Sequence, residues 1–160
     1  NKTYNWRTDA AIAPGGYFDD LASHGLDLFI FLLGDIEKAQ GLALNQQELY
    51  SAKDAITGNW LHKNGITGQG TWNFGCDDRE DRVEIYGSMG KISFSIFNEE
   101  DIVLTNEKGD LRCFVEHPKH VQKFHVEGMG DYFFKGKPHP STGKTALRTS
   151  WVMDRILGNS

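Results

Sequence analysis

The sequence is poor in cysteine and in positive charge. Its two cysteines, Cys76 and Cys113, lie far apart and form no Cys-x-x-Cys motif. A disulfide framework is therefore not expected, and we expect two free thiols in a reducing cytoplasm. Lys and Arg number 17 against 22 Asp and Glu, which gives a formal net charge of −5. Because nucleic-acid binding requires clustered basic side chains, this class of partner is excluded.

Long apolar runs are also missing. The longest run, residues 26–33, is interrupted by Asp27 and is far shorter than the ~20 residues that span a bilayer. We therefore expect no membrane partner. The chain has 160 residues and shows no repeat or linker, so residues 1–160 are predicted to form a single domain. Because the chain begins at Asn1 without a methionine, we expect it to be a piece of a longer protein.

The pattern of apolar residues predicts an α+β fold. Residues 1–12 look extended and end in a turn at Pro14-Gly15-Gly16, and a helix follows over residues 17–33. Strands are expected at residues 38–45, 55–62, 66–74, 82–86, 91–97, 102–105 and 111–116. Asn64-Gly65 predicts a hairpin with a two-residue turn. Helices are expected again over residues 121–135 and 142–157, the second with Ser141 or Thr142 as its N-cap. The strands are expected to form a mostly antiparallel open sheet with helices on one face.

The helix predicted over residues 17–33 carries a polar stripe. Its apolar face consists of Phe18, Leu21, Ala22, Gly25, Leu28, Phe29, Leu32 and Leu33. Asp20, His24 and Asp27 follow at i, i+4 and i+7 on the opposite face, beside Phe31. As a surface pair, Asp20 and His24 would contribute only about 0.2–0.5 kcal/mol. A neighbouring carboxylate also orients an imidazole and favours its charged form, which suits a general base. The spacing therefore permits either an amphipathic helix or a proton-transfer site.

Three other motifs are better explained by surface structure. Residues 143–145 read Gly-Lys-Thr, but a P-loop requires a glycine where Pro138 stands and a buried strand before it. His117 and His120 have tolerable spacing for metal ligands, yet Pro118 separates them and no third ligand is near. Residues 76–82 form a charged, solvated loop. We expect no metal site.

Several motifs in order resemble the C-terminal domain of the family of glucose–fructose oxidoreductase and inositol dehydrogenase (Gfo/Idh/MocA). Residues 15–27 match its Gly-Gly-x-x-x-Asp-x-x-x-His-x-x-Asp signature, and Trp6-Arg7-Thr8-Asp9 precedes them. Residues 68–97 are similar to its central strands, and residues 120–150 to its closing helices. The family often has three glycines where this chain has two after Ala13-Pro14, so the loop is expected to differ.

The resemblance implies the second half of a two-domain oxidoreductase. The N-terminal dinucleotide-binding domain, absent from this chain, would bind NAD or NADP in the full-length parent. The fragment alone is expected to bind no cofactor and to be inactive, and we name no cofactor-binding residue. A small sugar or polyol is the implied substrate. The sheet face is expected to form a homodimer or homotetramer.

The resemblance also assigns the site residues. His24 takes the position of the catalytic histidine, which would accept the proton of a substrate hydroxyl, and Asp20 that of its acidic companion. Gly15 and Gly16 would let the backbone approach substrate or cofactor. Arg7 would contact substrate or cofactor, although a surface arginine is nearly as plausible. Asp27 would either orient the imidazole or stabilise local packing.

Three functions stay open from the sequence. The first is an NAD(P)-dependent sugar or polyol dehydrogenase. The second is a glycosidase of the same family that uses NAD without net turnover. The third is a noncatalytic module for assembly or ligand binding.

Overall fold

The structure, a computed structural model, describes residues 4–159, which form two compact units. The first contains the residues up to 77 and those from 141 onward, and the second contains residues 78–140. The elements of the first are α1 (Tyr17–Leu33), β1 (Ile36–Leu44), β2 (Ala55–His62), β3 (Thr67–Asn73) and α3 (Gly143–Leu157). Those of the second are β4 (Val83–Gly87), β5 (Gly90–Phe94), β6 (Ile102–Asn106), β7 (Gly109–Cys113) and α2 (Lys123–Lys135). All strand pairs in this part of the chain are antiparallel, which confirms the predicted α+β class, and they divide between two sheets.

Helix α1 has the bounds predicted from the sequence. It follows Gly16, whose φ of 68° lies in the left-handed region, and it stops at Gly34, whose φ is 91°. The residues it buries are Phe18, Ala22, Gly25, Leu26 and Ile30. Predicted and observed faces overlap but differ at one edge, since Leu26 and Ile30 are buried whereas Leu32 is 51% exposed. The face is displaced because α1 packs against both the sheet and α3.

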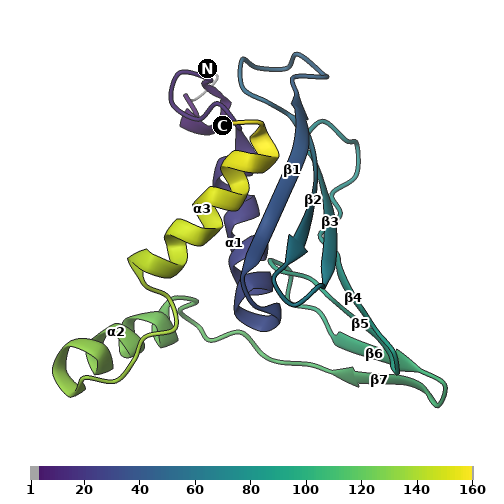
Figure 1. The fold of residues 1–160 in the computed structure, drawn as a ribbon, viewed down its shortest axis with the longest axis vertical. Helices are drawn as coiled ribbons and strands as arrows, with labels where there is room; N and C mark the ends of the chain where they lie inside the picture. The colour runs from purple at the N-terminus through teal and green to yellow at the C-terminus, as the bar shows by residue number, and fades with distance from the viewer. Residues whose placement is uncertain (1–3, 160) are drawn as a thin grey trace. The chain divides into compact units, whose positions relative to one another are not determined.

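The first unit is a two-layer sandwich of a three-stranded sheet and two helices. The sheet has the order β1-β2-β3, and α1 and α3 cover one face of it (Figure 1). Aromatic side chains join the layers: Phe18 lies edge-on to Trp72 at 4.9 Å between ring centroids. Phe29 stacks on Trp60 at 5.7 Å. These large rings add to the hydrophobic stabilisation from the aliphatic residues of the same core.

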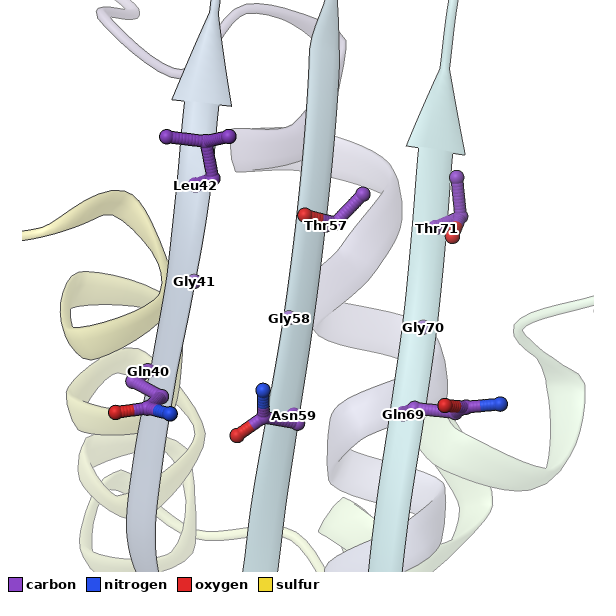
Figure 2. Close-up of a pocket in the computed structure, with 9 residues that line it drawn as sticks. All are labelled: Gln40, Gly41, Leu42, Thr57, Gly58, Asn59, Gln69, Gly70 and Thr71. Carbon is purple, nitrogen blue, oxygen red and sulfur yellow. The ribbon is translucent and has the colours of Figure 1, made fainter.

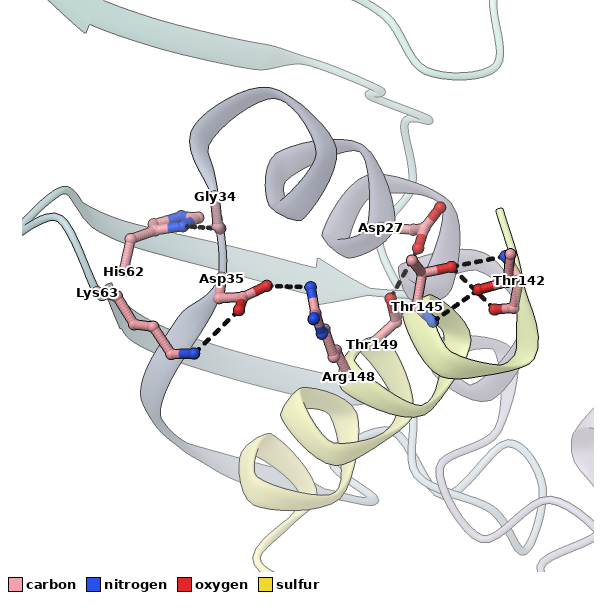
Figure 3. A network of polar contacts seen from close by, with 9 residues as sticks. All are labelled: Asp27, Gly34, Asp35, His62, Lys63, Thr142, Thr145, Arg148 and Thr149. Carbon is pink, nitrogen blue, oxygen red and sulfur yellow. Dashed lines mark hydrogen bonds and ion pairs between the residues drawn. The ribbon is translucent and has the colours of Figure 1, made fainter. Parts of the chain in front are cut away.

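Polar contacts fix α3 to the rest of this unit (Figure 3). Helix α3 begins after Thr142, one of its two predicted caps, where Thr142 and Thr145 exchange hydrogen bonds in a capping box. The Asp35 carboxylate pairs with Lys63 at 2.9 Å and with Arg148 at 2.5 Å. The hydrogen bond from Lys63, followed by the charge of Arg148, lowers the pKa of Asp35 below its ordinary value.

The opposite face of the sheet carries no helix of its unit and is mostly uncharged. Figure 2 shows a row of glycines, Gly41, Gly58 and Gly70, that crosses the three strands in register. Amides lie on one side of this row and Leu42 and two threonines on the other: Gln40, Asn59, Gln69, Leu42, Thr57 and Thr71. Together they line a shallow hollow on the open sheet face.

Several local predictions were wrong. The strands predicted at residues 91–97 and 111–116 end earlier, at Phe94 and Cys113. The hairpin between β2 and β3 has three loop residues, because the His62 N–H bonds to the Ile66 carbonyl at 2.8 Å. Gly65, with a φ of 89°, ends that loop in the left-handed conformation, which is typical of a turn followed by a bulge. The amino-terminal segment is also not extended, because Trp6–Thr8 forms a 3-10 helix. Residues 1–3 of that predicted segment lie outside the described residues.

The second unit is a four-stranded meander followed by α2. Its strands have the order β4-β5-β6-β7. Glu84 on β4 accepts hydrogen bonds from Lys91, Tyr86 and Arg82, which together lower its pKa to about 2. Helix α2 buries none of its residues, and Phe134 is 88% exposed. Among the described residues no helix is long and apolar enough to cross a bilayer.

Candidate functional site

The candidate site lies where the 3-10 helix Trp6–Thr8 meets the first turns of α1. Asn5 caps the 3-10 helix, because its side-chain Oδ1 accepts the Arg7 backbone N–H at 3.1 Å. Thr8 Oγ1 closes the same turn by donating to the Asn5 carbonyl at 2.8 Å. These bonds close the turn that carries Arg7, and a bond from Asn5 Nδ2 to the Tyr17 hydroxyl joins this turn to α1.

Arg7 and Asp20, both predicted site residues, form an ion pair with each other. Arg7 Nε donates to Asp20 Oδ2 at 2.7 Å, and about a third of each side chain is exposed. A carboxylate has acceptor capacity on both oxygens, so Asp20 can still accept a hydrogen bond from a ligand on Oδ1. The pair thus orients the carboxylate that was predicted to assist His24.

His24 lies one turn after Asp20 on an exposed part of α1. Phe31, two turns further on, is 68% exposed. Both residues thus lie on an exposed side of the helix, where a ligand can reach the imidazole.

Asp27 links two helices. Its Oδ1 accepts a hydrogen bond from Thr149 Oγ1 on α3 at 2.9 Å, and Thr149 is only 4% exposed (Figure 3). Of the two roles considered for Asp27, this contact supports the packing role for that oxygen. Its predicted part in ligand binding stays a prediction.

Gly15 and Gly16 are buried and packed closely against the fold. A Cβ on Gly16 would lie 2.3 Å from the Lys53 carbonyl oxygen. The Gly15 N–H donates to Asp19 Oδ2 at 2.9 Å, and a Cβ there would meet that carboxylate. Desolvation raises the pKa of Asp19, although the Gly15 N–H opposes the shift. Both glycines thus have a structural requirement, and the predicted contact with substrate or cofactor stays a prediction.

A further contact at this site, between Asn5 and Tyr17, was not predicted from the sequence. Asn5 Nδ2 donates to the Tyr17 hydroxyl oxygen at 2.8 Å. Tyr17 is seven residues before His24, so the two lie on the same side of α1. That spacing was the signal available in the sequence.

Neither a parallel βαβ unit nor a cluster of three metal-ligating side chains is present among the described residues. Dinucleotides bind where a parallel βαβ unit places a glycine-rich loop at a helix N-terminus, whereas the strand pairs of residues 4–159 are antiparallel. In the same residues no group of three or more His, Cys, Asp and Glu side chains could hold a metal ion. Cys76 and Cys113 are free and exposed.

Comparison with known proteins identifies the class to which this fold and site belong. The family model described as the GFO/IDH/MocA C-terminal domain matches residues 1–93. A curated relative, "Oxidoreductase P35" of Formosa agariphila, is 32% identical over 155 residues, which are 96% of this chain and 47% of the relative. The chain therefore belongs to the GFO/IDH/MocA C-terminal domain family, and it spans about half the length of that relative.

Solved structures agree with this assignment. An oxidoreductase of Thermotoga maritima is 28% identical, with a TM-score of 0.77 over 99% of this chain and 48% of its own. A levoglucosan dehydrogenase, solved with NADH and levoglucosan, has a TM-score of 0.82 at 15% identity, over 99% of this chain and 52% of its own. At this low identity the second match shows the fold alone.

Proposed function

We propose that this chain is the substrate-binding and catalytic half of an NAD(P)-dependent sugar or polyol dehydrogenase. The observation that carries the proposal is the juxtaposition on α1 of an exposed His24 with the Arg7–Asp20 ion pair. The oxidoreductase relative supports the class of reaction. The levoglucosan dehydrogenase, which is similar in fold alone, makes a sugar the first substrate to test.

In this proposal His24 moves the proton and Asp20 holds the substrate. Oxidation of an alcohol removes a hydride from carbon and a proton from oxygen, so a base must lie at the hydroxyl. His24 accepts that proton through a ring nitrogen, while Asp20, oriented by Arg7, accepts a hydrogen bond from a second hydroxyl. The nicotinamide, bound by the remaining half of the parent protein, supplies the hydride acceptor. The isolated chain would then be inactive.

The first test uses the intact parent protein, denatured to release bound small molecules. We expect mass spectrometry to find NAD or NADP in the released material. The parent should also reduce added cofactor, seen as a gain in absorbance at 340 nm, with at least one of D-glucose, myo-inositol, levoglucosan and glycerol.

Two results would contradict this function. Hydrolysis of a glycoside without net absorbance change would indicate the glycosidase instead. If the parent releases no cofactor, binds none that is added and turns over no substrate, the noncatalytic module is favoured.

We also propose that the open face of the β1–β3 sheet pairs with a second copy of the parent, giving a homodimer or a homotetramer. The face is broad, nearly uncharged and partly apolar, since Leu42 is 59% exposed (Figure 2). Exposed apolar surface flanked by amides is typical of a protein interface.

The pairing predicts that a charge on this face lowers the oligomeric state. Leu42→Arg with Asn59→Arg would place like charges opposite one another across the interface, so the intact parent should sediment as a smaller species. The matched control is Leu111→Arg on β7, which is 67% exposed and lies in the second unit. Unchanged sedimentation of the double variant would contradict pairing through this face.

A further inference from the structure

The amide of Asn5 can take only one orientation. A backbone N–H can only donate, so the atom that faces the Arg7 N–H at 3.1 Å must be the side-chain oxygen. The amide nitrogen then faces the Tyr17 hydroxyl at 2.8 Å. Because an amide nitrogen can only donate, the phenol oxygen is the acceptor in this bond.

This direction leaves the proton of Tyr17 available. A tyrosine hydroxyl has one proton to donate, and Asn5 Nδ2 cannot accept it. The other contacts that hold Tyr17 are between rings: Phe74 lies at 5.4 Å and Tyr50 at 6.1 Å between centroids. The ring is therefore fixed by packing while its O–H can donate to a ligand.

Tyr17 and His24 lie on the same side of α1. Seven residues separate them, which places them about 20° apart around the helix axis and about 10 Å apart along it. Asp20, held by Arg7, lies between them on the same helix. A six-membered sugar ring with a hydrogen bond of about 2.8 Å at each side spans a comparable distance.

We propose that Tyr17 donates a hydrogen bond to a substrate oxygen remote from the reacting carbon, and that Asn5 is the positioning residue that fixes this direction. The inference rests on the proposed function, because it takes the substrate to be a polyhydroxylated molecule bound against His24. It adds a specificity contact to the predicted set of Arg7, Asp20 and His24.

Two substitutions in the intact parent test whether the Tyr17 hydroxyl donates to substrate and whether Asn5 fixes the direction of that hydrogen bond. Tyr17→Phe keeps the ring packing and removes the donor. Asn5→Asp keeps the shape and still accepts the Arg7 N–H, but its second carboxylate oxygen accepts the Tyr17 proton, so the hydroxyl can no longer donate to substrate. The substrate is whichever of D-glucose, myo-inositol, levoglucosan and glycerol the wild type oxidises.

We expect each substitution to raise KM about tenfold, the effect of one lost hydrogen bond, with kcat within about threefold of wild type. The double variant should have the KM of either single variant within about twofold, since both act through the same bond. Thermal unfolding of each variant should stay close to that of the wild type.

Other results would separate the two proposals. If the wild type oxidises a substrate and Tyr17→Phe leaves KM unchanged, the contact is wrong and the proposed function stands. If Tyr17→Phe raises KM but Asn5→Asp does not, Asn5 merely fills space and its positioning role is wrong. If the wild type oxidises none of the four probes, the proposed function fails and this inference fails with it.

Discussion

Replacing His24 by glutamine in the intact parent is expected to lower kcat by about 10²- to 10⁴-fold, the usual contribution of a positioned general base. Glutamine has a similar reach and can hydrogen-bond a hydroxyl, but it cannot accept the proton at neutral pH. KM should therefore change by only a few fold, because the Arg7–Asp20 pair still binds substrate. Initial rates at 340 nm with saturating cofactor would measure the effect.

A second exposed histidine provides the control for this result. His120→Gln changes an exposed residue of the second unit that is no part of the candidate site, and should leave kcat at its wild-type value. Free imidazole should restore part of the activity of His24→Ala, since His24 is exposed on α1. Turnover of His24→Gln within a few fold of the wild type would show that the histidine is an ordinary surface residue.

The elements with explicit end signals were predictable from the sequence. Helix α1 has its predicted bounds because Gly16 and Gly34 each adopt a positive φ that ends regular structure. Helix α3 begins after Thr142 because this threonine forms the capping box. Strand β2 also has its predicted bounds, residues 55–62. Its apolar and polar residues alternate because one face of the strand is buried.

Features that depend on tertiary contacts were not predictable. From the sequence, the buried face of α1 can be predicted only from the angular positions of its apolar residues. In the structure α3 also packs against α1, and the buried face includes Ile30. The 3-10 helix Trp6–Thr8 has no apolar periodicity to reveal it. In the hairpin, Asn64-Gly65 correctly located the turn, but the third loop residue depends on the register of the strands.

The candidate site shows the same division. The i, i+4, i+7 spacing placed Asp20, His24 and Asp27 on one helix, which is a local property. The pairing of Arg7 with Asp20 spans 13 positions and requires the 3-10 helix to fold back on α1. Likewise, Asp27 meets Thr149 across 122 positions, and only the folded chain reveals that contact.

The largest effect on stability is expected at Gly41 on β1, where the backbone of α3 packs closely against the sheet. A Cβ at this position would lie 2.4 Å from the Thr57 carbonyl oxygen and 2.5 Å from that of Ile156. Both atoms belong to backbone, so the neighbours cannot yield by rotating a side chain. Glycine is therefore required here by contact between α3 and the sheet.

Gly41→Ala is expected to lower the free energy of unfolding of the intact parent by about 3 kcal/mol, at the upper end of typical overpacking costs. The methyl group must separate α3 from β1 or shift β1 against β2, and either movement disturbs the packing of Ile156 in the core. Urea unfolding followed by tryptophan fluorescence would report the change, because Trp60 and Trp72 pack in this core.

The matched control is Gly143→Ala at the start of α3, where an added Cβ meets nothing within 4 Å and stability should stay within about 1 kcal/mol. Equal midpoints for Gly41→Ala and the control would mean that α3 does not pack against β1 at this distance.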